Sequence, residues 1–136
     1  MIWMITLHKQ FVKSFLEGEK EIELRTRVPK KLQKDDIIVV AQSGTHNKVV
    51  MKMSVLSVIK LSPTEMFERY YRSIQVNYLA YKNYTKAREW VYGIKTCNVK
   101  KLDEGLHTSD FGIKKAPQWF RKVSLVEYLK YCKKEK

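Results

Sequence analysis

Two kinds of apolar pattern alternate along the first part of the chain. The run IWMITL at residues 2–7 is continuously apolar, which is typical of a buried strand. Over residues 9–17 the apolar positions fall on one face of a short helix, and Gly18 supplies the left-handed turn that commonly ends one. From Lys20 to Arg27 the period changes to two, which predicts a strand that begins directly after the helix.

Two longer strands and a helical region are predicted next. Asp35–Gln42 and Val49–Leu61 are both rich in aliphatic residues. The apolar phase of the second strand changes near Val55, which predicts a β-bulge of the kind that bends a strand around a barrel. The SPTE segment starting at Ser62 has the form of a helix cap, and a second helix is expected over residues 76–83.

The C-terminal part completes an α+β pattern. Strands are predicted at residues 89–99 and 118–123, and Ser124 caps a final helix. The order is β-α-β-β-β-α-α-β-β-α, and most strand connections are too short for helical crossovers. We therefore predict a curled, mainly antiparallel or mixed sheet or pseudo-barrel with helices at its ends. No repeat or linker interrupts the chain, so residues 1–136 are expected to form one domain.

Positive charge is the strongest compositional signal. Lys and Arg total 27 against 14 Asp and Glu, a net charge of +13, and the excess is greatest over residues 86–136. Such a field attracts polyanions, which favours a nucleic-acid partner over the alternatives of a solubility surface or a basic tail. A membrane surface is less favoured, because the basic residues do not gather on one amphipathic helix. No signal peptide or apolar run of about 20 residues is present, so a cytoplasmic protein is expected.

Cysteine and histidine positions argue against a metal site. Cys97 and Cys132 are far apart and neither belongs to a C-x-x-C pair, so free, buried thiols are expected. His8, His46 and His107 show no ligand spacing with each other or with the cysteines. The sequence predicts neither a metal nor a cofactor.

The segment GEKEIELR at residues 18–25 concentrates charge on a predicted strand. Alternation places four charged side chains in one row, with neighbours about 6–7 Å apart. These are Glu21, Glu23, Arg25 and Arg27. One interpretation is an ordinary solvated or edge strand whose charges pair. The other is a site: the sharp turn that Gly18 permits would let Lys20, Glu23 and Arg25 converge at one mouth of the barrel.

The same residues resemble the signature of a known family. Gly18, Lys20, Glu23 and Arg25 match G-x-K-x-x-E-x-R, and the chain thereby resembles the ASCH domain, a branch of the PUA-like superfamily. The preceding helix, the basic turn with Pro29 and the ending FGIKKAPQWFRKV are also similar. One departure is Asp35, which stands where the family usually has glycine at a strand start.

The resemblance implies a β-barrel-like PUA fold and RNA binding, often connected with transcription or translation. Lys20 and Arg25 would meet phosphate or a base edge, and Glu23 would accept from an amino group or hold the cations in place. Arg27 and Arg121 are further candidates. Among the aromatic residues, Trp90, Tyr92 and Phe120 are expected to pack in the core. Trp119 is the candidate for stacking on a base, because QWFRK mixes rings with cations.

Two other functions remain open. Some ASCH-like proteins are enzymes: one branch hydrolyses N4-acylated cytidines with the motif lysine, a threonine where this chain has Glu23, and a separate glutamate, for which Glu65 or Glu68 lies in the corresponding region. Another branch has been proposed to cut RNA, for which Lys20 and a tyrosine such as Tyr92 are the candidates. The acidic residues around Lys20 are expected to oppose the lowered pKa that either chemistry needs. The third possibility is a protein-interaction module for an acidic partner.

Overall fold

The computed structural model describes residues 1–134 and confirms the predicted order of elements. In chain order these are β1 (Ile2–Leu7), α1 (Lys9–Leu16), β2 (Ile22–Arg25), β3 (Ile37–Gln42), β4 (Val49–Leu61), α2 (Pro63–Ile74), α3 (Tyr78–Thr85), β5 (Val91–Lys101), the 3-10 helix η1 (Thr108–Phe111), β6 (Arg121–Val123) and α4 (Leu125–Lys134). η1 lies between the predicted strands at residues 89–99 and 118–123, in a segment for which no helix or strand was predicted.

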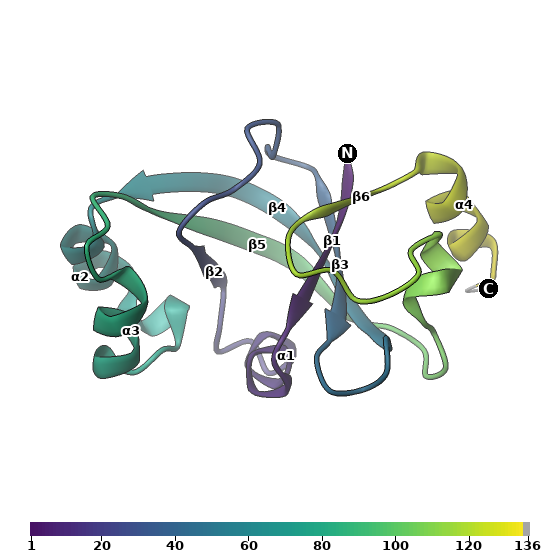
Figure 1. Cartoon of the computed structure of the whole chain (residues 1–136), viewed down its shortest axis with the longest axis horizontal. Coiled ribbons are helices and arrows are strands. Elements are labelled where there is room, and N and C mark those ends of the chain that lie inside the picture. Colours follow the sequence, from purple (N-terminus) through teal and green to yellow (C-terminus); the bar gives the residue numbers. More distant parts are fainter. Residues whose placement is uncertain (135–136) are drawn as a thin grey trace.

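The strands form one curled sheet in the order β2-β5-β4-β3-β1-β6. β1 and β3 run parallel and the other pairs are antiparallel, so the sheet is mixed, as predicted. The β4–β5 pairing shifts register between Val55 and Ser57, which confirms the predicted bulge near Val55. Figure 1 shows these two long strands running from the α2–α3 end of the molecule to the end that carries η1 and α4.

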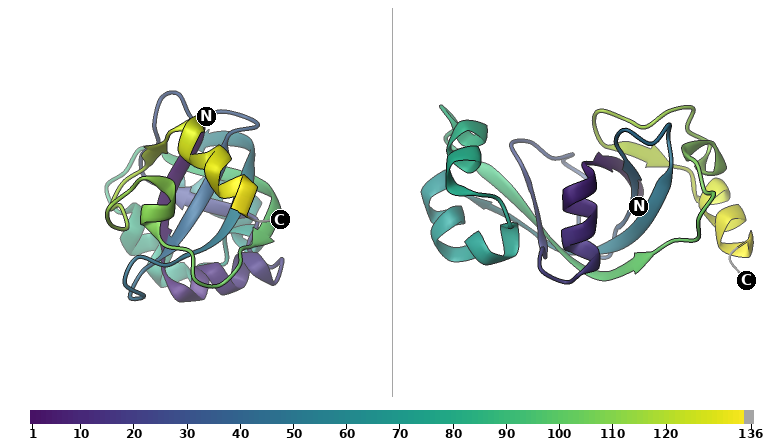
Figure 2. Two further views of the ribbon diagram at one scale, coloured as in Figure 1. Left: turned by 90° about the vertical axis from the view of Figure 1, so that its right-hand side faces the viewer. Right: turned by 90° about the horizontal axis from the view of Figure 1, so that it is seen from below.

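Three apolar clusters hold the helices to the sheet. α1 packs Val12 and Phe15 against the inner cluster, which also draws on β1, β3, β4 and β5. α4 and η1 pack on residues of β1 and β3 at one end. At the other end α2 and α3 cover Ile22 and Leu24 of β2. The two views of Figure 2 show the sheet wrapping around its interior, with α1 on its flank and the other helices at the ends.

The strand of charged residues departs most from the sequence prediction. β2 has four residues and, among the strands that the structure describes, pairs with β5 alone, at one edge of the sheet. Of the two interpretations of its charged residues, the solvated strand face does not fit Glu23, which is only 6% exposed between the buried Ile22 and Leu24. An edge strand buried on both faces requires its polar side chains to find partners inside the protein.

Some burial predictions also need correction. Phe120 is buried and Tyr92 is half-buried, but Trp90 is 43% exposed because it lies just outside the start of β5, with Lys60 Nζ 5.0 Å from its ring centre. Both cysteines are half-buried rather than buried. Over residues 1–134, no helix combines the length and apolar character needed to cross a membrane.

Candidate functional site

The turn between α1 and β2 sets the position of the motif residues. Gly18 adopts a φ of 78°, the left-handed conformation that the sequence predicts at this helix end. A side chain there would meet no atom within 4 Å, so the glycine is required by the backbone conformation and not by lack of space. The amides of Glu19 and Lys20 both donate to the Ser14 carbonyl at 3.1 Å. The chain therefore turns tightly, and Lys20 points into the protein.

Lys20 is a buried cation held against the end of a helix. Lys20 is 2% exposed, and its Nζ donates to the carbonyl of Ile74 at 2.6 Å. Ile74 is the last residue of α2, so the ammonium meets the negative end of that helix. The ring centres of Phe11 and Phe15 lie 5.1 and 5.4 Å from Nζ, at cation–π distance.

Burial lowers the pKa of Lys20 below its ordinary value. The loss of solvent around the ammonium is the largest cause, Glu23 acts in the opposite direction, and Arg25 lowers the pKa further. Glu23 thus opposes the lowered pKa, as expected from the sequence, but the loss of solvent outweighs it. Glu19 and Glu21 are exposed, and Glu23 alone does not offset the desolvation.

Glu23 and Arg25 form an ion pair inside the protein. Arg25 Nε donates to Glu23 Oε2 at 2.7 Å, and the exposed fractions of the two side chains are 16% and 7%. Their spacing of two residues puts both on one face of β2, as the sequence predicts. The guanidinium also lies 5.2 Å from the ring centre of Phe120. The charges therefore do pair, but they pair next to a cavity and not on a solvated strand face.

Lys20, Glu23 and Arg25 come together in the wall of a cavity of about 350 Å³, here called the motif cavity. The remaining wall is formed by Thr6, Leu7, His8, Phe11, Leu24, Val76, Ala80 and Tyr84. The volume lies in the range of small-ligand sites, about 300–1,000 Å³. The sequence prediction that the three motif residues converge thus agrees with the structure, while their role stays a prediction.

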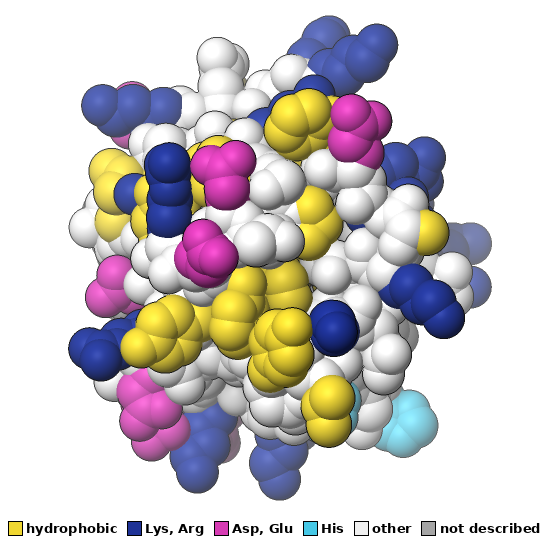
Figure 3. All heavy atoms as spheres, turned by 90° about the vertical axis from the view of Figure 1, so that its left-hand side faces the viewer, with side chains coloured by type: hydrophobic (Ala, Val, Ile, Leu, Met, Phe, Trp, Pro, Cys, Tyr) yellow, Lys and Arg dark blue, Asp and Glu magenta, His cyan; other side chains and the backbone are white. Residues whose placement is uncertain are grey.

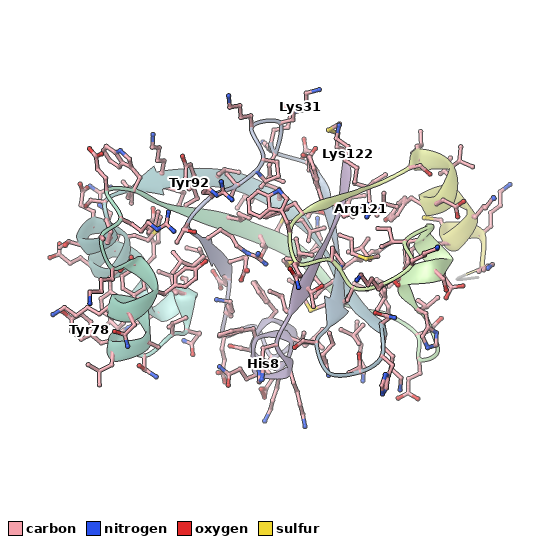
Figure 4. The ribbon with its side chains drawn as sticks, in the orientation of Figure 1. His8, Lys31, Tyr78, Tyr92, Arg121 and Lys122 are labelled. Carbon is pink, nitrogen blue, oxygen red and sulfur yellow. The ribbon has the colours of Figure 1, made fainter. Side chains whose placement is uncertain are left out.

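The opposite walls of the motif cavity include His8 and Tyr84, which were not predicted from the sequence. His8 could have been suspected, because it lies where β1 ends and α1 begins; its Nδ1 caps the helix by accepting from the amide of Gln10 (Figure 4). Tyr84 carries no such signal, because only the folding of α3 against the sheet brings it opposite the motif.

A second cavity, of about 440 Å³, adjoins the first and is here called the arginine cavity. Its wall is formed by Arg25, Thr26, Arg27, Tyr84, Arg88 and Trp119. Arg25 and Tyr84 belong to both cavities. The guanidinium of Arg27 lies 5.5 Å from the ring centre of Trp119, which is 42% exposed. The structure thus brings two further predicted site residues together beside the motif and adds Arg88, which the sequence analysis missed.

Several candidate residues lie outside both cavities. Arg121 is exposed on β6, which pairs with β1 at the sheet edge opposite β2 (Figure 4). Tyr92 pairs with Arg25 in the β2–β5 register but lines neither cavity. Glu65 and Glu68 are on α2, where Glu65 pairs with Arg69 at 3.4 Å, and neither lines the motif cavity or the arginine cavity.

No metal site is formed in the part of the chain that the structure describes. Within residues 1–134 no three His, Cys, Asp or Glu side chains gather in a group that could hold a metal ion. The polar and aromatic groups that line the two cavities are lysine, arginine, one carboxylate, histidine, threonine hydroxyls and aromatic rings.

Comparison with solved structures identifies the fold. The ASCH protein of Zymomonas mobilis superimposes with a TM-score of 0.83 at 16% identity, covering 97% of this chain and 94% of that one. The hypothetical protein PH0355 has a TM-score of 0.55 at 20% identity, over 75% of this chain and all of its own. Protein PSPTO5229 from Pseudomonas syringae gives 0.51 at 7% identity, over the full length of both chains. No curated protein matches the sequence.

The family is decided by sequence as well as by fold. The family model of the ASCH domain matches residues 5–102, a segment that begins in β1, ends just after β5 and contains the whole motif. The structural matches, all at low identity, add that the curled six-stranded α+β sheet is the one found in ASCH structures. This chain belongs to the ASCH domain family and has its PUA-like fold.

Proposed function

We propose that this protein binds single-stranded RNA and takes one unpaired base into the motif cavity. The observation that carries the proposal is the convergence of Lys20, Glu23 and Arg25 on one wall of a ligand-sized cavity. The membership of a family whose fold is generally RNA-binding supports it, as does the net charge of +13.

The charged wall has the groups needed to bind the polar edge of a base. Glu23 offers carboxylate oxygens to an exocyclic amino group, with Oε2 already accepting from Arg25 Nε. Arg25 keeps its terminal N–H groups as donors, and Lys20 uses one of its three for Ile74. Each of these bonds would include a charged group, and such bonds are stronger than neutral ones.

The remaining walls suit the faces of a flat ring. Phe11, Val76 and Ala80 supply apolar surface, and Tyr84 supplies an aromatic ring that is 46% exposed. Proteins recognise single-stranded RNA by stacking splayed bases on such groups while polar side chains bond to the base edge. A base that is paired within a duplex has no free edge to offer, so the cavity favours single strands.

Fluorescence anisotropy of labelled single-stranded RNA tests this proposal. Lys20→Met and Arg25→Met each remove a charge from the motif cavity while keeping much of the side-chain volume. Each should weaken binding about tenfold or more, the value of a charged hydrogen bond. The matched control is Lys130→Met, because Lys130 is exposed on α4 at the far end of the molecule (Figure 1).

The control should change affinity no more than about threefold, and circular dichroism should show all three variants folded. Equal losses in the three variants would place the RNA elsewhere and overturn the proposal. No RNA binding by the wild type at low salt, together with co-purification of an acidic protein, would favour the interaction-module alternative.

One observation favours a second candidate, hydrolysis of an acylated nucleoside by Lys20. Its pKa is lowered by burial, which raises the share of neutral amine that a nucleophile or base requires. Incubation with N4-acetylcytidine would then change the absorbance of the nucleoside, and Lys20→Met would abolish the change. No turnover at high protein concentration would exclude this substrate, and the RNA-binding proposal would be unaffected.

A further inference from the structure

We infer that the arginine cavity is a phosphate subsite, so that the ligand of the motif cavity is a nucleotide within an RNA strand and not a free nucleoside. This inference rests on the proposed function and names the ligand class of the same site. It adds Arg88 to the residues that contact the ligand and distinguishes an RNA-strand site from a nucleoside site.

Charge in the arginine cavity is largely uncompensated. Three of its six wall residues are arginines, namely Arg25, Arg27 and Arg88, and none is acidic. Arg25 is paired with Glu23, whereas Arg27 and Arg88 form no ion pair within residues 1–134. An anion placed between guanidinium groups relieves their mutual repulsion and receives several charged hydrogen bonds. Phosphate matches the planar donor geometry of arginine especially well.

The backbone holds these arginines from two separate parts of the chain. Arg25 ends β2 and Arg27 follows two residues later. Arg88 lies in the connection between α3 and β5, where its amide donates to the Thr85 carbonyl at 3.0 Å. The preceding Ala87 has a φ of 60°, a left-handed conformation that is uncommon for a residue other than glycine. This turn brings Arg88 to the wall opposite the motif strand.

The two residues that line both cavities determine which part of a nucleotide would lie in each cavity. Because Arg25 and Tyr84 line both, a ligand whose base fills the motif cavity has its sugar and phosphate beside these two residues. The phosphate then lies within the arginine cavity. A ligand with a phosphate attached to the bound nucleoside can therefore occupy both cavities at once, whereas a nucleoside has no group for the arginine cavity to neutralise.

Trp119 extends the subsite toward the next base of the strand. One face of its indole carries Arg27, whose guanidinium is 5.5 Å from the ring centre, and its edge contact with Phe120 at 5.1 Å fixes the ring. The residue remains 42% exposed. Stacking of a base on a held aromatic ring is worth about tenfold in affinity or more. A dinucleotide therefore gains from the phosphate and from the second base.

Isothermal titration calorimetry with a graded set of ligands tests the subsite. The set comprises the four ribonucleosides, their 3′- and 5′-monophosphates, and the corresponding dinucleoside monophosphates. For the preferred base, one monophosphate should bind the wild type about tenfold more tightly than the nucleoside. Arg27→Gln and Arg88→Gln should each remove most of that gain and leave nucleoside affinity unchanged. Trp119→Ala should reduce only the additional gain of the dinucleoside monophosphate.

Arg69→Gln is the matched control, because Arg69 is also an exposed arginine but pairs with Glu65 on α2 outside the cavity. It should keep the full preference for the phosphorylated ligand. Arg27 and Arg88 are exposed as well, so their replacement should leave the fold intact.

The outcomes separate this inference from the function on which it rests. Equal affinity for nucleoside and monophosphates, or equal losses in Arg88→Gln and Arg69→Gln, would overturn the phosphate subsite alone. RNA binding would in that case still depend on Lys20 and Arg25. If those two residues are also unimportant for RNA, the proposed function fails as well.

Discussion

Two buried charged residues of opposite sign, Asp36 and Lys20, differ in how their surroundings stabilise the charge. Burial alone would raise the pKa of Asp36, but hydrogen bonds from the Met1 ammonium, the Trp3 indole and the Gln33 amide hold it below its usual value. The charged form of Asp36 is therefore stabilised inside the fold. Lys20 has one neutral acceptor and a lowered pKa, so folding disfavours its charged form. An anion or carbonyl of a bound ligand would replace part of the hydration that the Lys20 ammonium loses on burial. Asp36 already accepts from three donors inside the protein, so a ligand would not stabilise its charge in the same way.

Asp36→Asn should reduce the free energy of unfolding by about 2 kcal/mol at pH 7. The two carboxylate oxygens accept from Met1, Trp3 and Gln33, and an amide would turn an N–H group toward one of these donors. The measurement is urea denaturation, with Asp35→Asn as the control, because Asp35 is the exposed neighbour. Asp35→Asn should change stability by no more than about 0.5 kcal/mol.

The lowered pKa of Asp36 also predicts how the stability difference between the wild type and Asp36→Asn changes with pH. A carboxyl group whose folded pKa is depressed stabilises the protein above its unfolded pKa of about 3.9, and this contribution is lost as the pH falls through the folded value. The difference between wild type and Asp36→Asn should therefore shrink between pH 5 and pH 2. A difference that is constant over this interval would show that the charge of Asp36 contributes nothing.

At the level of elements, local patterns predicted most of the structure and long-range packing accounts for what was missed. The helix stop at Gly18, the caps at Ser62 and Ser124 and the bulge near Val55 all follow from local backbone preferences. By contrast, the burial of Glu23 depends on long-range packing around the motif cavity, which no local pattern encodes.

Some residues of the candidate site could likewise be predicted from local patterns, and others could not. Period-two alternation predicted that Glu23 and Arg25 share a face of β2, and the motif itself selected Lys20. Tyr84 and Arg88 come from α3 and the turn after it, where the sequence offered only a weak helical pattern. The lowered pKa of Lys20 was also missed, because nearby acids in the sequence indicate charge but do not indicate desolvation.

For the whole molecule, the positive charge is spread well beyond the two cavities. Figure 3 shows Lys and Arg side chains around the rim of the α2–α3 end, with apolar side chains gathered between them. The exposed large apolar residues of these helices are Tyr71, Tyr78, Leu79 and Tyr84. If the protein binds RNA as proposed, a net charge of +13 would attract the strand over a wide surface, and the arginine cavity would hold one phosphate at a specific place.

The salt dependence of binding should consequently grow with RNA length. For single strands, the logarithm of affinity falls against the logarithm of salt concentration with a slope of about −0.7 per phosphate contacted. A trinucleotide with two phosphates should give a slope near −1.4, and Arg88→Gln should make it shallower by about 0.7. RNA of about 20 nucleotides should give a steeper slope, because its phosphates also reach lysines outside the cavities.

Anisotropy titrations from 50 to about 300 mM salt measure both slopes. If the slope does not change with RNA length, all the phosphate contacts lie in the arginine cavity. If Arg88→Gln leaves the trinucleotide slope unchanged, Arg88 does not contact a phosphate.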